Sequence, residues 1–332
     1  MSKVPASQGK VPASQGKEPA FEGKLPASQG KETFTGWVIR QQSGFFYVYT
    51  SQGMVVCHLR GRLKQGPMLG DIAAVGDRVQ VNIQPDGSGT IEQVEPRQSA
   101  LVRLDPRPKG VYRQVLLANP DQVVLVFACT QPTPHLRMLD RFLVVTEKQQ
   151  VPALIVANKV DLFGLKEARE LFDLYPPLGY SVIYTSARSG LGLAELRQHL
   201  AGKLTALAGP SGVGKSSLLN AIQPNLGLAV NEVNQARDRG RHTTNVREMF
   251  PLDEGGYVCD LPGLRSLALW DTQPEELDGY FPELRELVQH CQFNDCTHQD
   301  EPGCAVVQAV EEGTVNPERY ESYLRLRFGE GY

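Results

Sequence analysis

Long apolar runs are missing from this sequence of 332 residues, which has no stretch of 18 or more consecutive apolar residues. A helix that crosses a bilayer needs about 20 such residues. The first residues also lack the apolar segment of a secretory signal peptide. We therefore expect a cytoplasmic protein that has no membrane partner.

Cysteine and net charge are also scarce. The chain has 6 cysteines and a formal net charge of −3. In a cytosolic chain of this length, six cysteines favour a metal site or free thiols over a disulfide framework. Cys57, Cys129 and Cys259 lie within apolar runs, where we expect buried structural thiols. The charge gives no overall attraction to nucleic acid, so any RNA contact must come from local basic patches.

Large apolar residues are almost absent from residues 1–33. This segment contains the heptads KVPASQG, KVPASQG, KEPAFEG and KLPASQG, with Lys3, Lys10, Lys17 and Lys24 in register. A proline and a glycine in every heptad exclude a continuous coiled-coil helix. We expect a disordered tail, because this composition cannot offset the entropy of ordering. A basic tether that touches RNA is the alternative.

Residues 34–100 have the pattern of an all-β domain. Short apolar or alternating runs are separated by glycine: GWVIRQQSG, GFFYVYTSQG, GMVVCHLRG, GDRVQVNI and GTIEQVEPR. Such runs are typical of strands. Five strands in roughly 65 residues predict a small closed barrel of the OB type.

One end of this barrel is a candidate RNA-binding surface. Arg60, Arg62 and Lys64 follow the third predicted strand. Aromatic residues lie nearby in the sequence, namely Phe45, Phe46, Tyr47 and Tyr49. Basic groups beside aromatic rings are typical of surfaces that bind single-stranded nucleic acid. The alternative is that half of the rings belong to the core and the charges only solvate an edge.

Residues 101–275 are predicted to form an α/β domain. Beyond residue 119, continuous apolar runs such as QVVLVFACT, VPALIVANK and KLTALAG alternate with helical patterns such as HLRMLDRFLVVTEKQQ and GLAELRQHLAG. This alternation indicates a parallel sheet covered by helices on both faces. Ligands of such sheets bind at the carboxyl ends of the strands.

The strongest motif is GPSGVGKS at residues 209–216, which follows a predicted strand and opens a predicted helix. Its glycines allow backbone N–H groups to wrap the phosphates. Lys215 would bridge the β- and γ-phosphates, and the Ser216 hydroxyl would ligate Mg²⁺. The predicted nucleotide-binding residues of this loop are Gly209, Pro210, Ser211, Gly212, Val213, Gly214, Lys215, Ser216 and Ser217.

Two further segments would complete a phosphate site. In DLPG, at residues 260–263, Asp260 can hold Mg²⁺ and the Gly263 amide can contact the γ-phosphate. Thr243 and Thr244 are candidate switch threonines for Mg²⁺ and the γ-phosphate, and we assign Thr244 to the metal. They lie in an arginine-rich stretch that we expect to become ordered only on binding nucleotide or a partner.

Two motifs predict guanine recognition. In NKVD, at residues 158–161, Asp161 would accept from guanine N1–H and the exocyclic amine, a pattern that adenine lacks. Asn158 would support this loop, and Lys159 belongs to the same nucleotide-binding set. In YTSA, the backbone at Thr185, Ser186 and Ala187 would offer an N–H to guanine O6.

The order of the motifs is reversed relative to an ordinary GTPase, in which the phosphate loop comes first. Here the guanine motif begins at residue 158 and the phosphate loop at residue 209. A compact sheet tolerates new termini in a surface loop so long as its strands still assemble. The motifs together therefore indicate a circularly permuted α/β P-loop GTPase domain.

Residues 276–332 are predicted to form a helical zinc-binding domain. Cys291, Cys296, His298 and Cys304 make a Cys₃His set suited to one tetrahedral structural Zn²⁺ per chain. The alternative is three unligated thiols and a loop histidine, and His290 is expected to be a surface residue. Short helices are expected at PELRELVQH, AVVQAVEEG and PERYESYLRL, which would need the metal to form a core.

A barrel followed by NKVDL, GPSGVGKSSLLN, GRHTT and DLPG, and then by a Cys₃His segment, resembles the RsgA family of GTPases that depend on the small ribosomal subunit. The resemblance covers the chain from about residue 34 onward. It implies slow GTP hydrolysis, stimulation by the small subunit, and a role in late subunit maturation through rRNA contacts. The implied cofactors are GTP or GDP, Mg²⁺ and Zn²⁺, and we expect a monomer.

The catalytic group is a separate question, because Leu264 follows DLPG where many GTPases carry a glutamine that positions water. An apolar side chain cannot orient water. His242 in GRHTT matches the histidine proposed for this role in the family, and the alternative is a solvated loop histidine. The predicted catalytic set is His242, Lys215, Thr243 and Thr244.

Two other classes of function stay open at this point. The protein can be an RNA-binding assembly factor that uses GTP and GDP only as an affinity switch. It can also be an ATPase with an accidental NKVD sequence. Multiple turnover distinguishes an enzyme from a switch, and competition of GDP against ADP distinguishes the two nucleotides.

Overall fold

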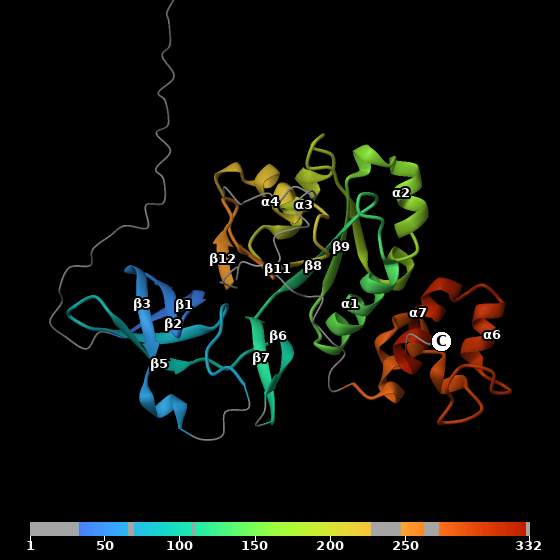
Figure 1. The fold of residues 1–332 in the computed structure, drawn as a ribbon, viewed down its shortest axis with the longest axis horizontal. Coiled ribbons are helices and arrows are strands. Elements are labelled where there is room, and N and C mark those ends of the chain that lie inside the picture. The colour runs from blue at the N-terminus through green and yellow to red at the C-terminus, as the bar shows by residue number, and fades with distance from the viewer. Residues whose placement is uncertain (1–32, 66–69, 108–109, 227–246, 262–271, 330–332) are drawn as a thin grey trace, which may run out of the picture.

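The computed structural model describes residues 33–65, 70–107, 110–226, 247–261 and 272–329. Within this part, a β-barrel and a C-terminal helical segment lie on opposite sides of an α/β domain (Figure 1). The predicted tail of residues 1–33 lies outside the described residues except for Thr33, which begins the first strand. No helix of the described residues is long and apolar enough to cross a membrane.

The barrel consists of β1 (Thr33–Gln42), β2 (Phe45–Thr50), β3 (Gly53–Leu59), β4 (Arg78–Ile83) and β5 (Gly89–Val94). Neighbouring strands pair in the order β1-β2-β3-β5-β4, and pairing of β1 with β4 closes the barrel. Inward side chains such as Val38, Val48 and Val81 are fully buried because successive residues of a strand point to opposite faces. The prediction of a closed five-strand barrel is confirmed.

The α/β domain is built on a sheet in the order β10-β9-β8-β11-β13-β12. Its strands are β8 (Gln122–Ala128), β9 (Ala153–Asn158), β10 (Ser181–Tyr184), β11 (Leu204–Ala208), β12 (Arg247–Pro251) and β13 (Tyr257–Asp260). All neighbouring pairs are parallel except β12 with β13. The guanine motif, the phosphate loop and Asp260 therefore all lie at the same edge of the sheet, where the parallel strands end.

Helices cover both faces of this sheet, as the continuous apolar strands predict. Along β8, Val123, Leu125 and Phe127 face α1 (Leu136–Lys148) and α2 (Leu165–Phe172). Val124 and Val126 face α3 (Leu193–Leu200) and α4 (Lys215–Ile222). The α/β architecture is confirmed, although α2 and β12 were not among the predicted elements.

A hairpin that the sequence analysis missed lies between the barrel and the α/β domain (Figure 1). It consists of β6 (Ala100–Arg107) and β7 (Gly110–Ala118). The side chain of Gln149 fixes it to the end of α1 by accepting from the backbone N–H of Val102 at 2.9 Å and donating to its carbonyl at 3.1 Å. In the sequence, one run with Leu101, Val102 and Leu104 and another that begins at Val111 and Tyr112 flank Pro108, Lys109 and Gly110. Apolar runs on either side of turn-forming residues are a hairpin signal.

The barrel and the α/β sheet are also continuous. β12 pairs with β1 through Arg40↔Glu248 and Gln41↔Arg247, so one sheet of 11 strands runs through both domains. The side chain of Arg247 adds a bond from Nη1 to the carbonyl of Val115 on the hairpin at 2.6 Å. The two domains are therefore joined by backbone hydrogen bonds as well as by the chain.

The C-terminal segment contains η6 (Pro274–Tyr280), α5 (Pro282–Arg285), η7 (Val288–His290), α6 (Ala305–Glu311) and α7 (Pro317–Phe328). The helix expected at PELRELVQH is divided between α5 and the 3₁₀ turn η7. Phe281, Leu284 and Tyr323 form a core that includes Val144 of α1. The segment therefore buries its apolar residues partly against the α/β domain.

Candidate functional site

The guanine motif begins at Asn158, the last residue of β9, which has 1% of its surface exposed. Asn158 Nδ2 donates to the carbonyl of Val213 at 2.8 Å. Asn158 Oδ1 accepts from Thr185 Oγ1 at 3.1 Å. One buried side chain thus joins the guanine motif, the phosphate loop and the segment that follows β10.

Lys159 connects the same loops a second time. It has a left-handed backbone conformation, with φ of +65°. Its Nζ donates to the carbonyl of Gly212 at 2.7 Å and also to that of Gln131. Burial lowers the pKa of Lys159, and the charge of Asp161 opposes this effect.

The residues predicted to read the base differ in exposure. Asp161, in η2 (Val160–Leu162), has an exposed side chain, and an ionised carboxylate can accept two hydrogen bonds at once. Ser186 is buried, and its Oγ accepts from the backbone N–H of Ser189 at 3.0 Å. Ala187 is half-buried against the core. An exposed acceptor therefore stands beside a fixed backbone loop, as guanine recognition requires.

The phosphate loop connects β11 to α4, and its backbone depends on glycine. Gly209, Gly212 and Gly214 have φ of +147°, +81° and +97°. A Cβ at Gly209 would lie 2.1 Å from the carbonyl oxygen of Val126, and one at Gly214 would lie 2.5 Å from Asn158 Nδ2. Both positions therefore require glycine for space as well as for conformation.

Lys215 is the first residue of α4. Its Nζ donates to the carbonyls of Gly209 and Pro210 at 2.9 Å each, which holds the ammonium group over the loop. The N-terminus of a helix attracts anions through its unpaired N–H groups and its dipole. The loop, the lysine and the helix start together suit a bound polyphosphate.

Asp260 ends β13 at the same edge of the sheet. Its Oδ1 is buried and has no hydrogen-bond partner among the described residues. Burial raises the pKa of Asp260, and the charge of Lys215 opposes the rise. A buried carboxylate oxygen without a partner is costly unless a cation or water satisfies it. Asp260 therefore fits a Mg²⁺ site that Ser216, in the first turn of α4, would share.

Several predicted residues lie outside the described part of the chain. They are His242, Thr243, Thr244, Gly263 and Leu264. The phosphate loop, the guanine motif and Asp260 are the described parts of the predicted nucleotide site.

The four predicted zinc ligands come together in the C-terminal segment, with their ligand atoms all within 4.8 Å of one another. His298 Nδ1 lies 3.6 Å from Cys291 Sγ and 3.5 Å from Cys304 Sγ, and the two sulfurs are 4.0 Å apart. Tetrahedral Zn²⁺ with ordinary bond lengths places its ligand atoms roughly 3.5–3.8 Å apart. The separations among Cys291, His298 and Cys304 therefore fit one tetrahedral ion, and Cys296 lies within 4.8 Å of these atoms as a candidate fourth ligand.

The chemistry of these thiols also suits a cation. Burial raises the pKa of Cys296 to about 12, and the neighbouring Cys304 and Cys291 raise it as well. Thiolates this close together repel one another, and a divalent cation removes that cost. His290 is exposed and is not part of the cluster, as expected.

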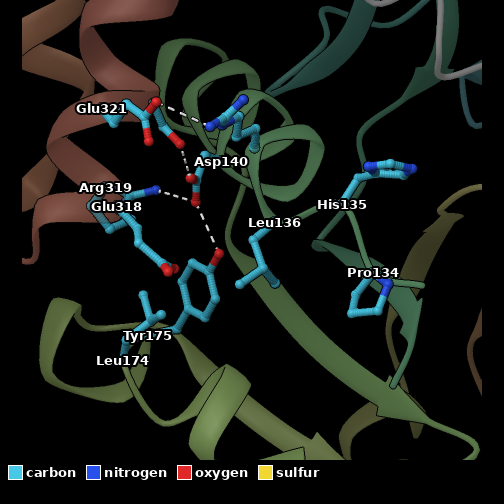
Figure 2. Close-up of a pocket in the computed structure, with 11 residues that line it drawn as sticks. Pro134, His135, Leu136, Asp140, Leu174, Tyr175, Glu318, Arg319 and Glu321 are labelled. Carbon is cyan, nitrogen blue, oxygen red and sulfur yellow. Dashed lines mark hydrogen bonds and ion pairs between the residues drawn. The ribbon is translucent and has the colours of Figure 1, made fainter. Parts of the chain in front are cut away.

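A cavity of about 300 Å³ lies where the α/β domain meets α7 (Figure 2). Arg319, with 1% of its surface exposed, donates to Asp140 Oδ1 at 2.7 Å and to Glu283 Oε1 at 2.6 Å. Tyr175 donates to the same Asp140 oxygen at 2.9 Å. Burial alone would lower the pKa of Arg319, and the two carboxylates more than reverse this. Because its charges satisfy one another, we assign this junction to domain packing.

Two residues with roles at these sites were missed by the sequence analysis. Gln131 contributes a contact to the guanine motif. Asp278 contacts His298 from outside the Cys₃His set. No periodicity or short motif marks these residues, because each acts on a group brought near it only by the fold.

Known proteins resemble the chain over almost all of its described length. The family model of the RsgA GTPase matches residues 94–270, and that of the RsgA N-terminal domain matches residues 35–91. A protein of Gemmatimonas aurantiaca named small ribosomal subunit biogenesis GTPase RsgA is 45% identical over 88% of this chain and 96% of its own length. A protein of the same name from Caldanaerobacter subterraneus is 40% identical over 89% of this chain and 95% of its own.

Solved structures agree with these relatives. The crystal structure of YjeQ from Thermotoga maritima has a TM-score of 0.72 and 37% identity, over 90% of this chain and 98% of that one. The crystal structure of YloQ, described as a circularly permuted GTPase, has a TM-score of 0.66 and 32% identity, over 94% of this chain and 96% of that one. The chain belongs to the RsgA family of GTPases, whose GTP-hydrolysing domain is circularly permuted.

Proposed function

We propose that this GTPase acts in late maturation of the small ribosomal subunit, and that docking on the subunit accelerates its GTP hydrolysis. The main support for the nucleotide site is the hydrogen bond from Asn158 Nδ2 to the carbonyl of Val213, which holds the guanine motif against the phosphate loop. The names of the relatives, which describe small ribosomal subunit biogenesis, support the small subunit as the partner. The protein would work as a monomer in the cytoplasm.

The described residues suggest how the nucleotide is held. Asp161 would accept from the guanine edge, with Asn158 and Lys159 fixing its loop and Ser186 and Ala187 offering backbone N–H groups. Backbone amides of residues 209–217 and the Lys215 ammonium would bind the phosphates. Ser216 and Asp260 would hold Mg²⁺ together with Thr244, and Gly263 and Thr243 would contact the γ-phosphate. The metal would neutralise charge that develops on the phosphate oxygens.

Water activation needs another group, because Leu264 occupies the position where many GTPases carry a glutamine that orients water. We propose that His242 orients the attacking water once the subunit has docked. Lys215, Thr243 and Thr244 would stabilise the phosphoryl group during transfer. Positioning and electrostatic stabilisation of this kind account for most of the rate enhancement in GTPases.

The barrel supports contact with rRNA. Arg60 directly follows β3, and Arg62 lies in the next 3₁₀ turn, which Lys64 ends. Both arginines are exposed and share the carboxylate of Glu92. Two aromatic rings on the outer face of β2 are also exposed, Phe45 by 51% and Tyr49 by 45%. Phe46, by contrast, is a core residue of the barrel. By strand register, Phe45 lies toward the end of β3 that precedes Arg60, whereas Tyr49 lies toward the other end of that strand. An exposed ring near basic groups suits unpaired bases and phosphates.

We also propose that Cys291, Cys296, His298 and Cys304 bind one structural Zn²⁺ per chain. The support is the convergence of their ligand atoms within 4.8 Å. A site with four protein ligands is closed, so the metal would contribute folding energy and no chemistry. Elemental analysis of freshly purified protein should find one zinc per chain, and Cys296→Ala should lose it while keeping GDP affinity. Absence of zinc from the wild type would refute this part of the proposal.

Two assays test the proposal against its alternatives. GDP should displace a fluorescent guanine nucleotide at least 100 times more effectively than ADP, since a site that hydrogen-bonds its ligand rejects analogues by about 10⁴-fold. Equal competition would indicate an ATPase. Multiple turnover of GTP that rises when purified small subunits are added supports the enzyme. Tight binding to subunits without any turnover would indicate an affinity switch.

A further inference from the structure

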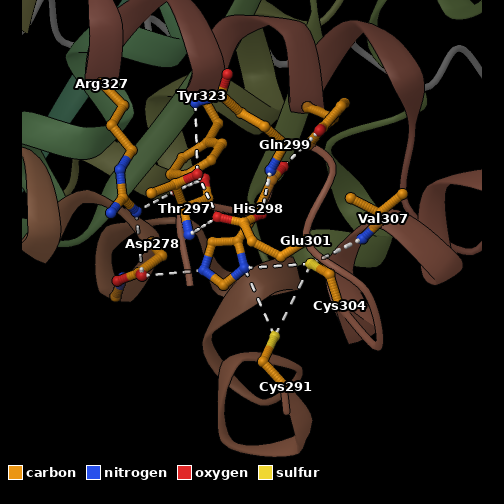
Figure 3. A network of polar contacts seen from close by, with 12 residues as sticks. Asp278, Cys291, Thr297, His298, Gln299, Glu301, Cys304, Val307, Tyr323 and Arg327 are labelled. Atoms are coloured by element: carbon orange, nitrogen blue, oxygen red, sulfur yellow. Dashed lines mark hydrogen bonds and ion pairs between the residues drawn. The ribbon is translucent and has the colours of Figure 1, made fainter. Parts of the chain in front are cut away.

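The imidazole ring of His298 is held from two sides (Figure 3). Its Nδ1 faces Cys291 Sγ and Cys304 Sγ, while its Nε2 lies 3.2 Å from Asp278 Oδ2. The ring is fully buried. A carboxylate only accepts, so the bond to Asp278 places the proton on Nε2 and leaves the lone pair of Nδ1 facing the sulfurs.

Asp278 is itself fixed in place. Its Oδ1 accepts from the backbone N–H of Gly279 at 2.7 Å, and Arg327 Nη1 lies 3.7 Å from its Oδ2. Its side chain is only 15% exposed. Both carboxylate oxygens therefore have partners that hold them in the orientation His298 needs.

The backbone of His298 shows why such support is needed. Its φ is +60°, in the left-handed region, which costs a residue other than glycine about 1–3 kcal/mol. Tyr320 donates from its hydroxyl to the carbonyl of His298 at 2.5 Å. The backbone and the ring of this one ligand are thus each held by a separate side chain.

Asp278 also lies at a particular place in the fold. It belongs to η6, which precedes α5 and packs on α1 of the α/β domain. Lys148 of α1 donates to Thr272 Oγ1 at 2.8 Å and lies 3.9 Å from Glu276 Oε2. The bond from His298 to Asp278 therefore connects the Cys₃His cluster to η6, the segment through which the C-terminal helices contact the GTPase domain.

We propose that Asp278 is a positioning residue for the metal site: it orients His298 toward the ion and so ties the ion to residues 272–281. This inference rests on the proposed zinc site. Carboxylates that hold a metal-binding histidine typically raise metal affinity by about 10–100-fold. Removal of either the metal or the carboxylate should loosen the same segment.

The test uses full-length protein loaded with Zn²⁺ or Co²⁺. Asp278→Ala should lower zinc affinity about 10–100-fold in competition with a chromophoric chelator. Asp278→Asn keeps an oxygen that accepts from Nε2–H, so it should restore a large part of the loss. Asp295→Ala is the matched control, because it removes an exposed carboxylate next to Cys296 and should change affinity less than about twofold.

Two further readouts separate positioning from a general loss of stability. At saturating Co²⁺, the visible spectrum of Asp278→Ala should differ from that of the wild type, because the imidazole is no longer oriented. Hydrogen exchange in residues 272–281 should become faster in wild type stripped of zinc and also in zinc-loaded Asp278→Ala. GDP affinity should stay at the wild-type value in every variant.

The outcomes distinguish the inference from the proposal beneath it. If the wild type binds neither Zn²⁺ nor Co²⁺, the proposed metal site itself is refuted. The role of Asp278 is overturned if the wild type binds zinc and Asp278→Ala has the same zinc affinity and the same cobalt spectrum as Asp295→Ala. Should Asp278→Ala fail to fold, Asp278→Leu replaces it, because leucine has a similar volume and no acceptor for Nε2–H. Wild-type zinc affinity, cobalt spectrum and exchange rates in Asp278→Leu would then overturn the role of Asp278.

Discussion

Asn158 Nδ2 donates to the carbonyl of Val213 at 2.8 Å, although 55 residues separate them in the chain. The bond lies between the loop that would read the base and the loop that would hold the phosphates. In this permuted domain the guanine motif comes first, yet the two loops meet at the ends of β9 and β11. The order of the motifs along the chain therefore does not determine how the site is assembled, because strand pairing alone sets which loops are neighbours.

Asp161→Asn should weaken GTP binding by at least about 100-fold, since hydrogen bonds to a charged group contribute about 1.5–3 kcal/mol each. The amide presents a donor to guanine N1–H and the exocyclic amine. The same change should improve binding of xanthine nucleotides, whose edge offers an acceptor there. Calorimetric titration with GTP and XTP measures both, and an unchanged preference for GTP would show that Asp161 does not read the base.

Gly209→Ala should disrupt the phosphate loop, because its Cβ would lie 2.1 Å from the carbonyl oxygen of Val126. GDP affinity should fall by more than tenfold. Gly179→Ala is the matched control: its φ is +94° and nothing lies within 4 Å of its Cβ, so it isolates the conformational cost. That cost is about 1–2 kcal/mol and should leave GDP affinity unchanged. Equal affinities of the two variants would contradict the packing at Gly209.

Arg319→Met should destabilise the junction between the α/β domain and α7 by about 3–5 kcal/mol, because it leaves Asp140 and Glu283 buried without their cation. Arg325→Met, on the same helix, removes only a partly exposed pair with Glu321 and should cost about 0.5 kcal/mol or less. Urea unfolding followed by circular dichroism compares them. A similar shift in both variants would mean that the buried network does not hold the junction.

His242→Ala should abolish acceleration by the subunit while GTP affinity stays at the wild-type value. A group that orients water is commonly worth about 10²–10⁴-fold in rate. His290→Ala is the control, since it removes an exposed histidine that is not a predicted ligand. If His242→Ala turns over GTP at saturating subunit as fast as His290→Ala does, the catalytic group lies elsewhere, including in the ribosome itself.

Local patterns were sufficient for much of the fold. In β1 to β5, apolar and polar residues alternate because one face of each strand is buried. In β8, β9 and β11, the residues are continuously apolar because both faces are buried. Both patterns can be read directly from the sequence. The phosphate loop was equally clear because its glycines, lysine and flanking elements are adjacent in sequence. The four candidate zinc ligands lie within residues 291–304, and their short spacing drew attention to them for the same reason.

What the sequence did not reveal depends on distant contacts. Asp278 and His298 are 20 residues apart, and Asp140 and Arg319 are 179 apart. Nothing in the local pattern around Asp278 distinguishes it from a solvated acid. The pairing of β12 with β1 is likewise a property of the assembled sheet. Such contacts follow from how the domains pack, which no local periodicity encodes.

Activation of this GTPase by the small ribosomal subunit is the main feature of the proposed function. The most direct measurement is the GTP turnover rate of the full-length protein without subunits and at a saturating concentration of purified small subunits. We predict an increase of about 10²–10⁴-fold, the range expected when a water-orienting group is brought into place. Saturating subunits that bind the GTP-loaded protein but leave its turnover rate unchanged would contradict it.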